Sequence, residues 1–294
     1  MRAIPRTAAL LLGAALALGV AHAQTGASVP YVPTPKDVVE KMLKLARVGA
    51  GDYVIDLGCG DGRILVAAAK QFGARGFGVD INPERIAESD ANARKAGVTD
   101  RVAFHQQDLF KTDFSDATVL TMYLLPAVNR ALRPKILSDL KPGTRVVSHD
   151  FDLGAWEPDH KETMYSPDKY GVGGSSTVYL WIVPAKAAGN WSWQLSYGGA
   201  THRYQFAAKQ DFQMLSGDVT VDGASAKIHD GKLNGAEISF KVTAQVGGAP
   251  VVHEFNGRIN GDAVTGEVAL SGARLQSRLE WSAARTASAQ AQAK

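Results

Sequence analysis

The sequence of 294 residues contains a single cysteine, Cys59. One thiol excludes an internal disulfide framework and any metal site built from several cysteines. No histidine and carboxylate spacing typical of a metal site appears either, so we expect no bound metal. Cys59 lies inside a glycine-rich turn. We interpret it as a small side chain that fits this turn and not as a nucleophile.

The chain also has little net charge. Its 32 basic and 29 acidic residues leave a formal charge of +3, which is too small to indicate a nucleic-acid partner. No stretch combines clustered lysine and arginine with interleaved aromatic residues, so we expect no nucleic acid to bind. The length is sufficient for one full α/β domain and a smaller second domain.

Long apolar runs are missing as well. Residues 8–20 are apolar, but this run is shorter than the about 20 residues of a transmembrane helix. It follows Arg2 and Arg6 and precedes the small residues Ala21 and Ala23, a pattern typical of a secretory signal peptide. We therefore expect residues 1–23 to be a signal peptide and the chain to be periplasmic. An uncleaved segment that anchors the chain in the membrane is the alternative.

A glycine-rich turn follows the first predicted strand, in residues 54–63 (VIDLGCGDGR). Its glycines, which allow a tight turn and bring bare main chain against a ligand, are Gly58, Gly60 and Gly62. The dinucleotide pattern has its third glycine one position later and binds a pyrophosphate at the helix start. Here Asp56, which ends the predicted strand, and Asp61 already bring negative charge to that place. The turn therefore favours a ligand with a cationic end, and S-adenosylmethionine, with its sulfonium and amino groups, fits.

Two further acids follow the next predicted strands. Asp80 follows residues 75–79, and an acid there accepts hydrogen bonds from two ribose hydroxyls. Asp108 follows the strand that begins at residue 102; it suits an adenine amino group, and Leu109 suits the face of the ring. The predicted donor-binding residues are Asp56, Gly58, Cys59, Gly60, Gly62, Asp80, Ile81, Asp108 and Leu109.

The pattern of predicted elements changes after residue 184. Before it, strands alternate with helices, which indicates a parallel sheet, and residues 160–166 and 176–183 form a terminal hairpin. Residues 190–285 consist of short alternating runs between glycine-rich turns, including the near-copies GKLNG and GRING. We expect hairpins at these Asn-Gly pairs and about seven or eight strands in a small antiparallel barrel or sandwich. We expect the tail, residues 286–294, to be disordered.

These residues resemble the class I S-adenosylmethionine-dependent methyltransferases over residues 30–185. Residues 29–35 (VPYVPTP), the glycine turn, and residues 118–126 (TVLTMYLLP) are similar, more narrowly, to the small protein-lysine methyltransferases. That family includes the enzymes that modify the ATP synthase c-subunit and the adenine nucleotide translocase. The resemblance implies a Rossmann-like α/β fold with a seven-stranded sheet and S-adenosylmethionine as cofactor. It also implies a lysine of a membrane-associated protein as acceptor, with peripheral membrane association.

The acceptor is expected at the end of the fourth strand, in residues 121–126 (TMYLLP). Methyltransferases that act on amino nitrogens often have an acid or amide, two prolines and an aromatic residue there. This chain has TMYLLP instead of that pattern. The difference argues against a planar amide or a nucleobase as acceptor and is compatible with an aliphatic amine. We predict that Tyr123 packs on the methylene stem and binds the cation with its ring. We predict that Asp150, beside His149, helps to take the proton, so the predicted catalytic residues are Tyr123 and Asp150.

Two other functions stay open at this stage. One is an exported, non-catalytic binding protein with a methyltransferase-like fold, whose C-terminal β domain recognises a partner. The other is methylation of a small molecule by the same domain. The full set of donor residues favours the enzyme, because a silent domain has no reason to keep all of them. Export favours the binding protein, because the donor is not expected outside the cytoplasm. The sequence does not indicate the oligomeric state.

Overall fold

The computed structural model describes residues 31–273 and 275–286. The predicted signal peptide, residues 1–23, lies outside these residues, as does the predicted tail apart from Thr286. An α/β domain and then a closed β-barrel follow one another along the chain. Among the described residues, no helix combines the length and the apolar character needed to cross a membrane.

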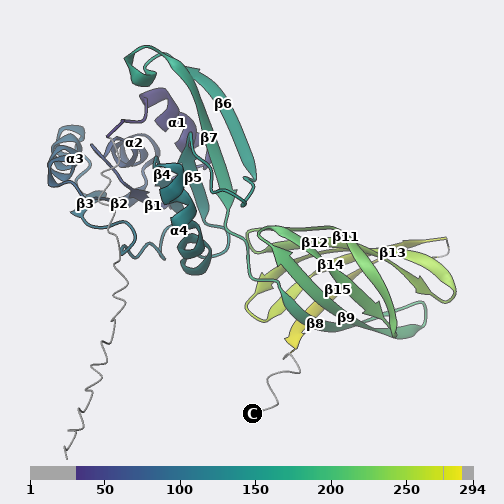
Figure 1. Cartoon of the computed structure of the whole chain (residues 1–294). Coiled ribbons are helices and arrows are strands. Elements are labelled where there is room, and N and C mark those ends of the chain that lie inside the picture. The colour runs from purple at the N-terminus through teal and green to yellow at the C-terminus, as the bar shows by residue number, and fades with distance from the viewer. Residues whose placement is uncertain (1–30, 274, 287–294) are drawn as a thin grey trace, which may run out of the picture. The chain divides into compact units, whose positions relative to one another are not determined.

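The α/β domain contains a mixed seven-stranded sheet (Figure 1). Its elements are α1 (Lys36–Leu45), β1 (Tyr53–Leu57), α2 (Arg63–Phe72), β2 (Arg75–Asp80), α3 (Pro83–Ala96), β3 (Val102–Gln106), β4 (Val119–Met122), α4 (Pro126–Asp139), β5 (Arg145–His149), β6 (His160–Ser166), the 3₁₀ turn η1 (Lys169–Gly171) and β7 (Gly174–Ile182). The strand order is β3-β2-β1-β4-β5-β7-β6. Strands β1 to β5 are parallel, whereas β7 pairs antiparallel with β5 and β6. This confirms the predicted seven-stranded fold with its antiparallel edge.

Alternate residues of the central strands pack into two separate cores, one on each face of the sheet. Val54 belongs to the core that holds helices α1, α2 and α3, whereas its neighbour Ile55 belongs to the core that holds α4. This division follows from the side-chain period of two along a strand. Because helices cover both faces, the sheet exposes the carboxyl ends of its parallel strands as the place for a ligand.

Helix α3 begins and ends where its sequence predicts. The side chain of Asn82 accepts a hydrogen bond from the Glu84 amide at 2.8 Å, and Pro83 takes the first helical position. Gly97 then ends the helix in the left-handed conformation. These are the usual start and stop signals of a helix. They fix the direction in which the chain leaves β2, and therefore the position of the turn at Asp80.

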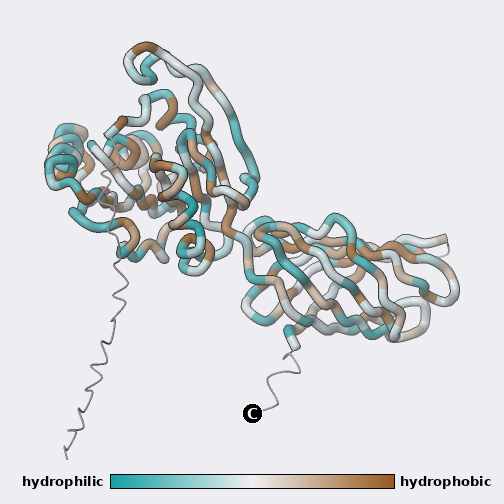
Figure 2. Tube along the Cα trace, in the orientation of Figure 1, coloured by the Kyte–Doolittle hydropathy of each residue, from teal (hydrophilic) through white to brown (hydrophobic). Residues whose placement is uncertain are grey.

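The second domain is a closed barrel of eight strands, which decides between the two predicted architectures. Its strands are β8 (Gly189–Tyr197), β9 (Ala200–Asp211), β10 (Met214–Val221), β11 (Ala224–Asn234), β12 (Glu237–Val246), β13 (Ala249–Asn260), β14 (Ala263–Gly272) and β15 (Leu275–Thr286). Neighbouring strands along the chain pair antiparallel, and β15 pairs with β8 to close the barrel. Hydrophilic and hydrophobic residues alternate along these strands (Figure 2).

Aromatic side chains fill the barrel. Trp193, Tyr204, Phe240, Phe255 and Trp281 are all buried and belong to one core. An eight-stranded barrel has an interior just wide enough for side chains to fill it. The two predicted hairpins are present, although the loops consist of residues 235–236 and 261–262. The asparagine is therefore the last strand residue in each case, and the glycine alone takes a positive φ.

Candidate active site

The glycine turn is closely packed. Gly58, Gly60 and Gly62 have φ values of 73°, 56° and 74°, in the left-handed region. A Cβ atom at Gly58 would lie 2.7 Å from Leu124, and one at Gly60 would lie 2.6 Å from the ring of Tyr31. Both the backbone conformation and the lack of space therefore require glycine here. The turn presents bare main chain at the carboxyl end of β1.

Asp80 joins this turn to the end of β2. Its Oδ2 accepts a hydrogen bond from the Gly60 amide at 3.0 Å, and its Oδ1 accepts one from the Asn82 amide at 2.9 Å. A carboxylate has lone pairs for about four hydrogen bonds, so two acceptor positions remain for the hydroxyls of a ribose. The next residue, Ile81, is 70 % exposed, which is unusual for a large apolar side chain.

Asp108 and Leu109 lie after β3, one strand further along the sheet. The Asp108 carboxylate accepts a hydrogen bond from the Phe110 amide at 2.9 Å, and Leu109 packs partly into the core. Phe110 itself is 46 % exposed. The residues predicted to contact the adenine, the ribose and the remainder of the donor therefore follow the strand order β3-β2-β1. This is a row of about 5 Å steps, matching an elongated ligand.

Asp56 was predicted to end the first strand, but it lies inside β1, which continues to Leu57. The side chain is buried, and its Oδ1 accepts a hydrogen bond from the Thr121 hydroxyl at 2.7 Å. In the described part of the chain its Oδ2 has no hydrogen-bond partner. Burial raises the pKa of Asp56 to about 7, and the charges of Asp80 and Asp61 add to this, while Thr121 opposes it. A buried carboxylate oxygen without a partner fits a ligand that brings a cation or an N–H group.

The other two predicted donor contacts are glycine-turn residues with different surroundings. Cys59 is buried, and burial raises the pKa of its thiol, so the thiol stays protonated and is a poor nucleophile. Gly62 is the N-cap residue before α2, and a Cβ there would lie 2.7 Å from the ring of Phe104. Both residues therefore shape the turn. Among the residues that the structure describes, no group of side chains is suited to hold a metal ion.

The segment before α1 crosses the glycine turn, which the sequence analysis did not predict. Arg63 donates from Nε to Asp61 Oδ1 at 2.9 Å and from Nη2 to Asp61 Oδ2 at 2.6 Å, a two-pronged ion pair, and it also donates to the Thr34 carbonyl at 2.9 Å. Arg85 lies over the ring of Tyr31, 4.4 Å from its centroid. The similarity of residues 29–35 to the lysine methyltransferases was the available signal, although it assigned no role to these side chains.

Tyr123 and Asp150 meet at the ends of β4 and β5. The ring of Tyr123 lies 4.0 Å from that of His149, and burial raises the pKa of Tyr123, with added effects of Tyr170 and Asp150. Asp150 has a φ of 59°, a strained conformation for a residue with a side chain. Two hydrogen bonds with Thr177 of β7 hold it, at 2.7 Å and 3.0 Å. The structure therefore brings the two predicted catalytic residues into one cluster.

His149 serves as a support in this cluster. It is fully buried, and its two ring nitrogens contact the hydroxyls of Thr34 at 3.2 Å and Ser176 at 3.0 Å. Burial lowers the pKa of His149 to about 4; Lys169 adds to this and Asp150 opposes it. The imidazole is therefore neutral near pH 7. Because both ring nitrogens already have partners, His149 orients its neighbours and has no nitrogen left for a methyl acceptor.

Asn129 and Trp156 are both fully buried. The Asn129 amide donates hydrogen bonds to the carbonyls of Phe151 at 3.0 Å and Asp152 at 3.3 Å, and so holds the turn after β5. Trp156 is fully buried, and its carbonyl accepts a hydrogen bond from the Trp181 indole at 2.7 Å. The Asn129 Oδ1 atom is buried and has no hydrogen-bond partner among the described residues.

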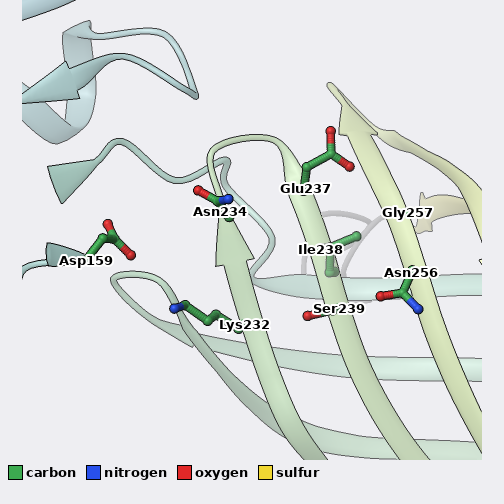
Figure 3. A pocket seen from close by; sticks show the side chains of 8 residues that line it. All are labelled: Asp159, Lys232, Asn234, Glu237, Ile238, Ser239, Asn256 and Gly257. Atoms are coloured by element: carbon green, nitrogen blue, oxygen red, sulfur yellow. The ribbon is translucent and has the colours of Figure 1, made fainter. Parts of the chain in front are cut away.

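A polar hollow of about 460 Å³ lies elsewhere in the chain (Figure 3). It is lined by Asp159, Lys232, Asn234, Glu237, Ile238, Ser239, Asn256 and Gly257. None of the predicted donor or acceptor residues contributes to it. Its lining mixes charges of both signs, so it does not indicate one class of ligand.

The chain is similar to known methyltransferases. The family profile described as the ANTKMT methyltransferase domain matches residues 56–160. A protein-lysine N-methyltransferase of Saccharolobus islandicus (strain REY15A) is 50 % identical over 156 residues, which are 53 % of this chain and 94 % of that protein. The adenine nucleotide translocase lysine N-methyltransferase of Mus musculus is 36 % identical over 165 residues, 54 % of this chain and 70 % of that protein.

One solved structure also matches with high identity. The RNA methyltransferase of Salinibacter ruber, in complex with S-adenosyl-L-homocysteine, is 51 % identical to this chain with a TM-score of 0.48. The match covers 53 % of this chain and 95 % of that one. The residues matched by the family profile all lie in the α/β domain.

Proposed function

The chain belongs to the protein-lysine N-methyltransferase family, and on that premise we propose that it methylates the side-chain nitrogen of a lysine in a protein substrate. It is an S-adenosylmethionine-dependent methyltransferase. The observation that carries the proposal is the 50 % identity to a protein-lysine N-methyltransferase along 94 % of that protein's length. The acidic and aromatic cluster at the ends of β4 and β5 supports a cationic, aliphatic acceptor.

The residues on β1, β2 and β3 fit the donor. The unpartnered Oδ2 of the buried Asp56 is the feature that fits it. The glycines allow the positive φ values of the turn that follows β1. Asp80 would hold the ribose, and Asp108 and Leu109 would hold the adenine. When bound, S-adenosylmethionine supplies a methyl group on a sulfonium, which is already activated for displacement. The chain's own residues have to align the acceptor behind that methyl group.

The acceptor also has to lose a proton. A lysine ammonium has a pKa of about 10.4 in water, so it is charged near pH 7. Asp150 presents a carboxylate that is fixed by β7 and that already accepts a hydrogen bond from an ammonium, that of Lys169, at 2.6 Å. We assign to Asp150 the binding of the acceptor ammonium and the uptake of its proton. Tyr123 would pack its ring against the acceptor's methylene stem.

Residues 1–23 carry the second part of the proposal. Their basic start, apolar run and small residues support export to the periplasm or attachment to the membrane. A membrane-associated protein is then the accessible class of substrate. Cell fractionation followed by N-terminal sequencing of the mature chain tests this part. A mature chain that starts at Met1 in the cytoplasmic fraction would contradict it.

A methyl-transfer assay tests the activity itself. The purified chain is first titrated with S-adenosylmethionine by calorimetry and then incubated with labelled donor and a membrane extract. We expect saturable donor binding and transfer of label to the protein fraction. Binding without any transfer would favour the non-catalytic binding protein, and label in small molecules alone would favour a small-molecule acceptor.

A further inference from the structure

We propose that Lys169 of the chain itself occupies the binding site for the acceptor ammonium, and that this lysine is methylated in cis when no other acceptor is present. The inference rests on the proposed function, since it names the residues that recognise the acceptor. We define the ammonium site as the Asp150 carboxylate, the Ser175 carbonyl and the ring of Tyr170.

Lys169 is an unusual lysine because its side chain is only 8 % exposed. Its Nζ donates hydrogen bonds to Asp150 Oδ2 at 2.6 Å and to the Ser175 carbonyl. The same Nζ lies 5.3 Å from the centroid of the Tyr170 ring. A carboxylate, a carbonyl and an aromatic face are the groups that bind an alkylammonium ion. This site is therefore built for a long aliphatic chain that ends in a primary ammonium.

The ammonium site lies on the acceptor side of the sheet. The predicted donor residues follow β3, β2 and β1, so the methyl end of a bound donor is directed towards the next strand, β4. Tyr123 follows β4 and Asp150 follows β5, which are the next two strands in the order. Because strands are about 5 Å apart, Tyr123 lies one strand beyond β1 and Asp150 two strands beyond it, on the side to which the methyl end is directed. The chain order also reverses between β1 and β4, where ligands bind in open α/β sheets.

The segment that carries Lys169 is able to withdraw. It is the turn between β6 and β7, and it contains Gly171 and Gly173 at φ values of 74° and 83°. Tyr170 has a φ of 54° and is 63 % exposed, and Val172 is 84 % exposed. The amides of Gly171, Val172 and Gly173 donate backbone hydrogen bonds within the turn and hold its local shape. The buried side chain of Lys169 ties this turn to Asp150, while the side chains of Tyr170 and Val172 stay largely exposed. An incoming lysine replaces these contacts with equivalent ones.

The transfer in cis balances as follows. The Lys169 ammonium gives a proton to Asp150, which releases it to solvent. The neutral amine then attacks the methyl carbon of S-adenosylmethionine, the carbon–sulfur bond breaks, and S-adenosylhomocysteine leaves. Lys169 becomes a monomethylammonium and keeps its charge. No further reactant is required.

The test uses the full chain with isotopically labelled S-adenosylmethionine and no added acceptor. Peptide mapping by mass spectrometry is expected to find one or more methyl groups on Lys169, in an amount that rises with time. Lys169→Arg keeps the positive charge and is expected to lose the label. The matched control is Lys161→Arg, which changes an exposed lysine of β6 and is expected to keep it.

Two results would overturn the inference while leaving the proposed function in place. One is an unmodified Lys169 after incubation without an added acceptor, for a chain that binds the donor and methylates a membrane extract in a separate assay. The other is label confined to lysines other than Lys169. Absence of donor binding would instead overturn the proposed function. If Lys169→Arg does not fold, the mapping of the wild-type chain still decides between these results.

Discussion

Replacing Asp80 by alanine tests the donor site most sharply, because this one carboxylate joins the glycine turn to β2. It accepts hydrogen bonds from the amides of Gly60 and Asn82, and two further acceptor positions face the proposed ribose. Hydrogen bonds to a charged group are worth about 1.5 kcal/mol each at the lower end, so losing two costs about 3 kcal/mol. This corresponds to a roughly 100-fold weaker Kd for S-adenosylmethionine.

Calorimetric titration of the wild-type and variant chains measures this difference. Asp100→Ala is the matched control, because Asp100 is an exposed acid whose side chain is 75 % accessible and which lies before β3. We expect the control to bind the donor as the wild type does. An Asp80→Ala chain that folds and binds the donor with unchanged affinity would refute the assignment of Asp80 to the ribose.

Three further predictions concern the same site. Gly60→Ala and Gly97→Ala both place a side chain at positive φ, and each is expected to lower the free energy of unfolding by about 1–2 kcal/mol. Only the alanine at position 60 would meet the Tyr31 ring, so only Gly60→Ala is expected to weaken donor binding in titrations. Burial raises the pKa of Asp56 above its unfolded value to about 7, so the folded state holds the extra proton between about pH 4 and pH 7. The donor-free chain therefore loses stability as pH rises through this window. In urea unfolding, the free energy of unfolding of Asp56→Asn is expected to rise relative to that of the wild type as pH increases from about 4 to about 7. A difference between the two free energies that stays constant with pH would contradict the assignment. Tyr123→Phe keeps the ring and is expected to retain most activity. Tyr123→Ala is expected to lower kcat/KM by about 2- to 30-fold, which corresponds to a cation–π contact of about 0.5–2 kcal/mol. Equal losses of kcat/KM in both variants would assign the role to the hydroxyl.

The sequence predicted the elements of the α/β domain well because their signals are local. The cap at Asn82, the proline at 83 and the glycine at 97 set the bounds of α3 without help from the rest of the fold. The alternation in residues 190–285 likewise predicted the strands of the second domain. It did not decide between a barrel and a sandwich, because both have the same alternation along each strand. Closure depends on the pairing of β15 with β8, a contact between distant residues.

The site was predicted in part for the same reason. The glycines, Asp80 and Asp108 were predicted from their places after strands, and Tyr123 and Asp150 from the strand order; the structure places them at the carboxyl ends of β1 to β5. Lys169 was not found, because a lysine in a hairpin turn is normally exposed. Its burial results from contacts with Asp150, 19 residues away, and with Ser175. Tyr31 was missed because its partner Arg85 lies on α3, far along the chain.

The chemical identity of the methylated product tests the central claim most directly. The full chain is incubated with a membrane extract and labelled S-adenosylmethionine, and the protein fraction is hydrolysed for amino-acid analysis. The account predicts that the label appears as Nε-methylated lysine and that the Asp80→Ala variant yields much less of it. Label on any other amino acid, with none on lysine, would contradict the account.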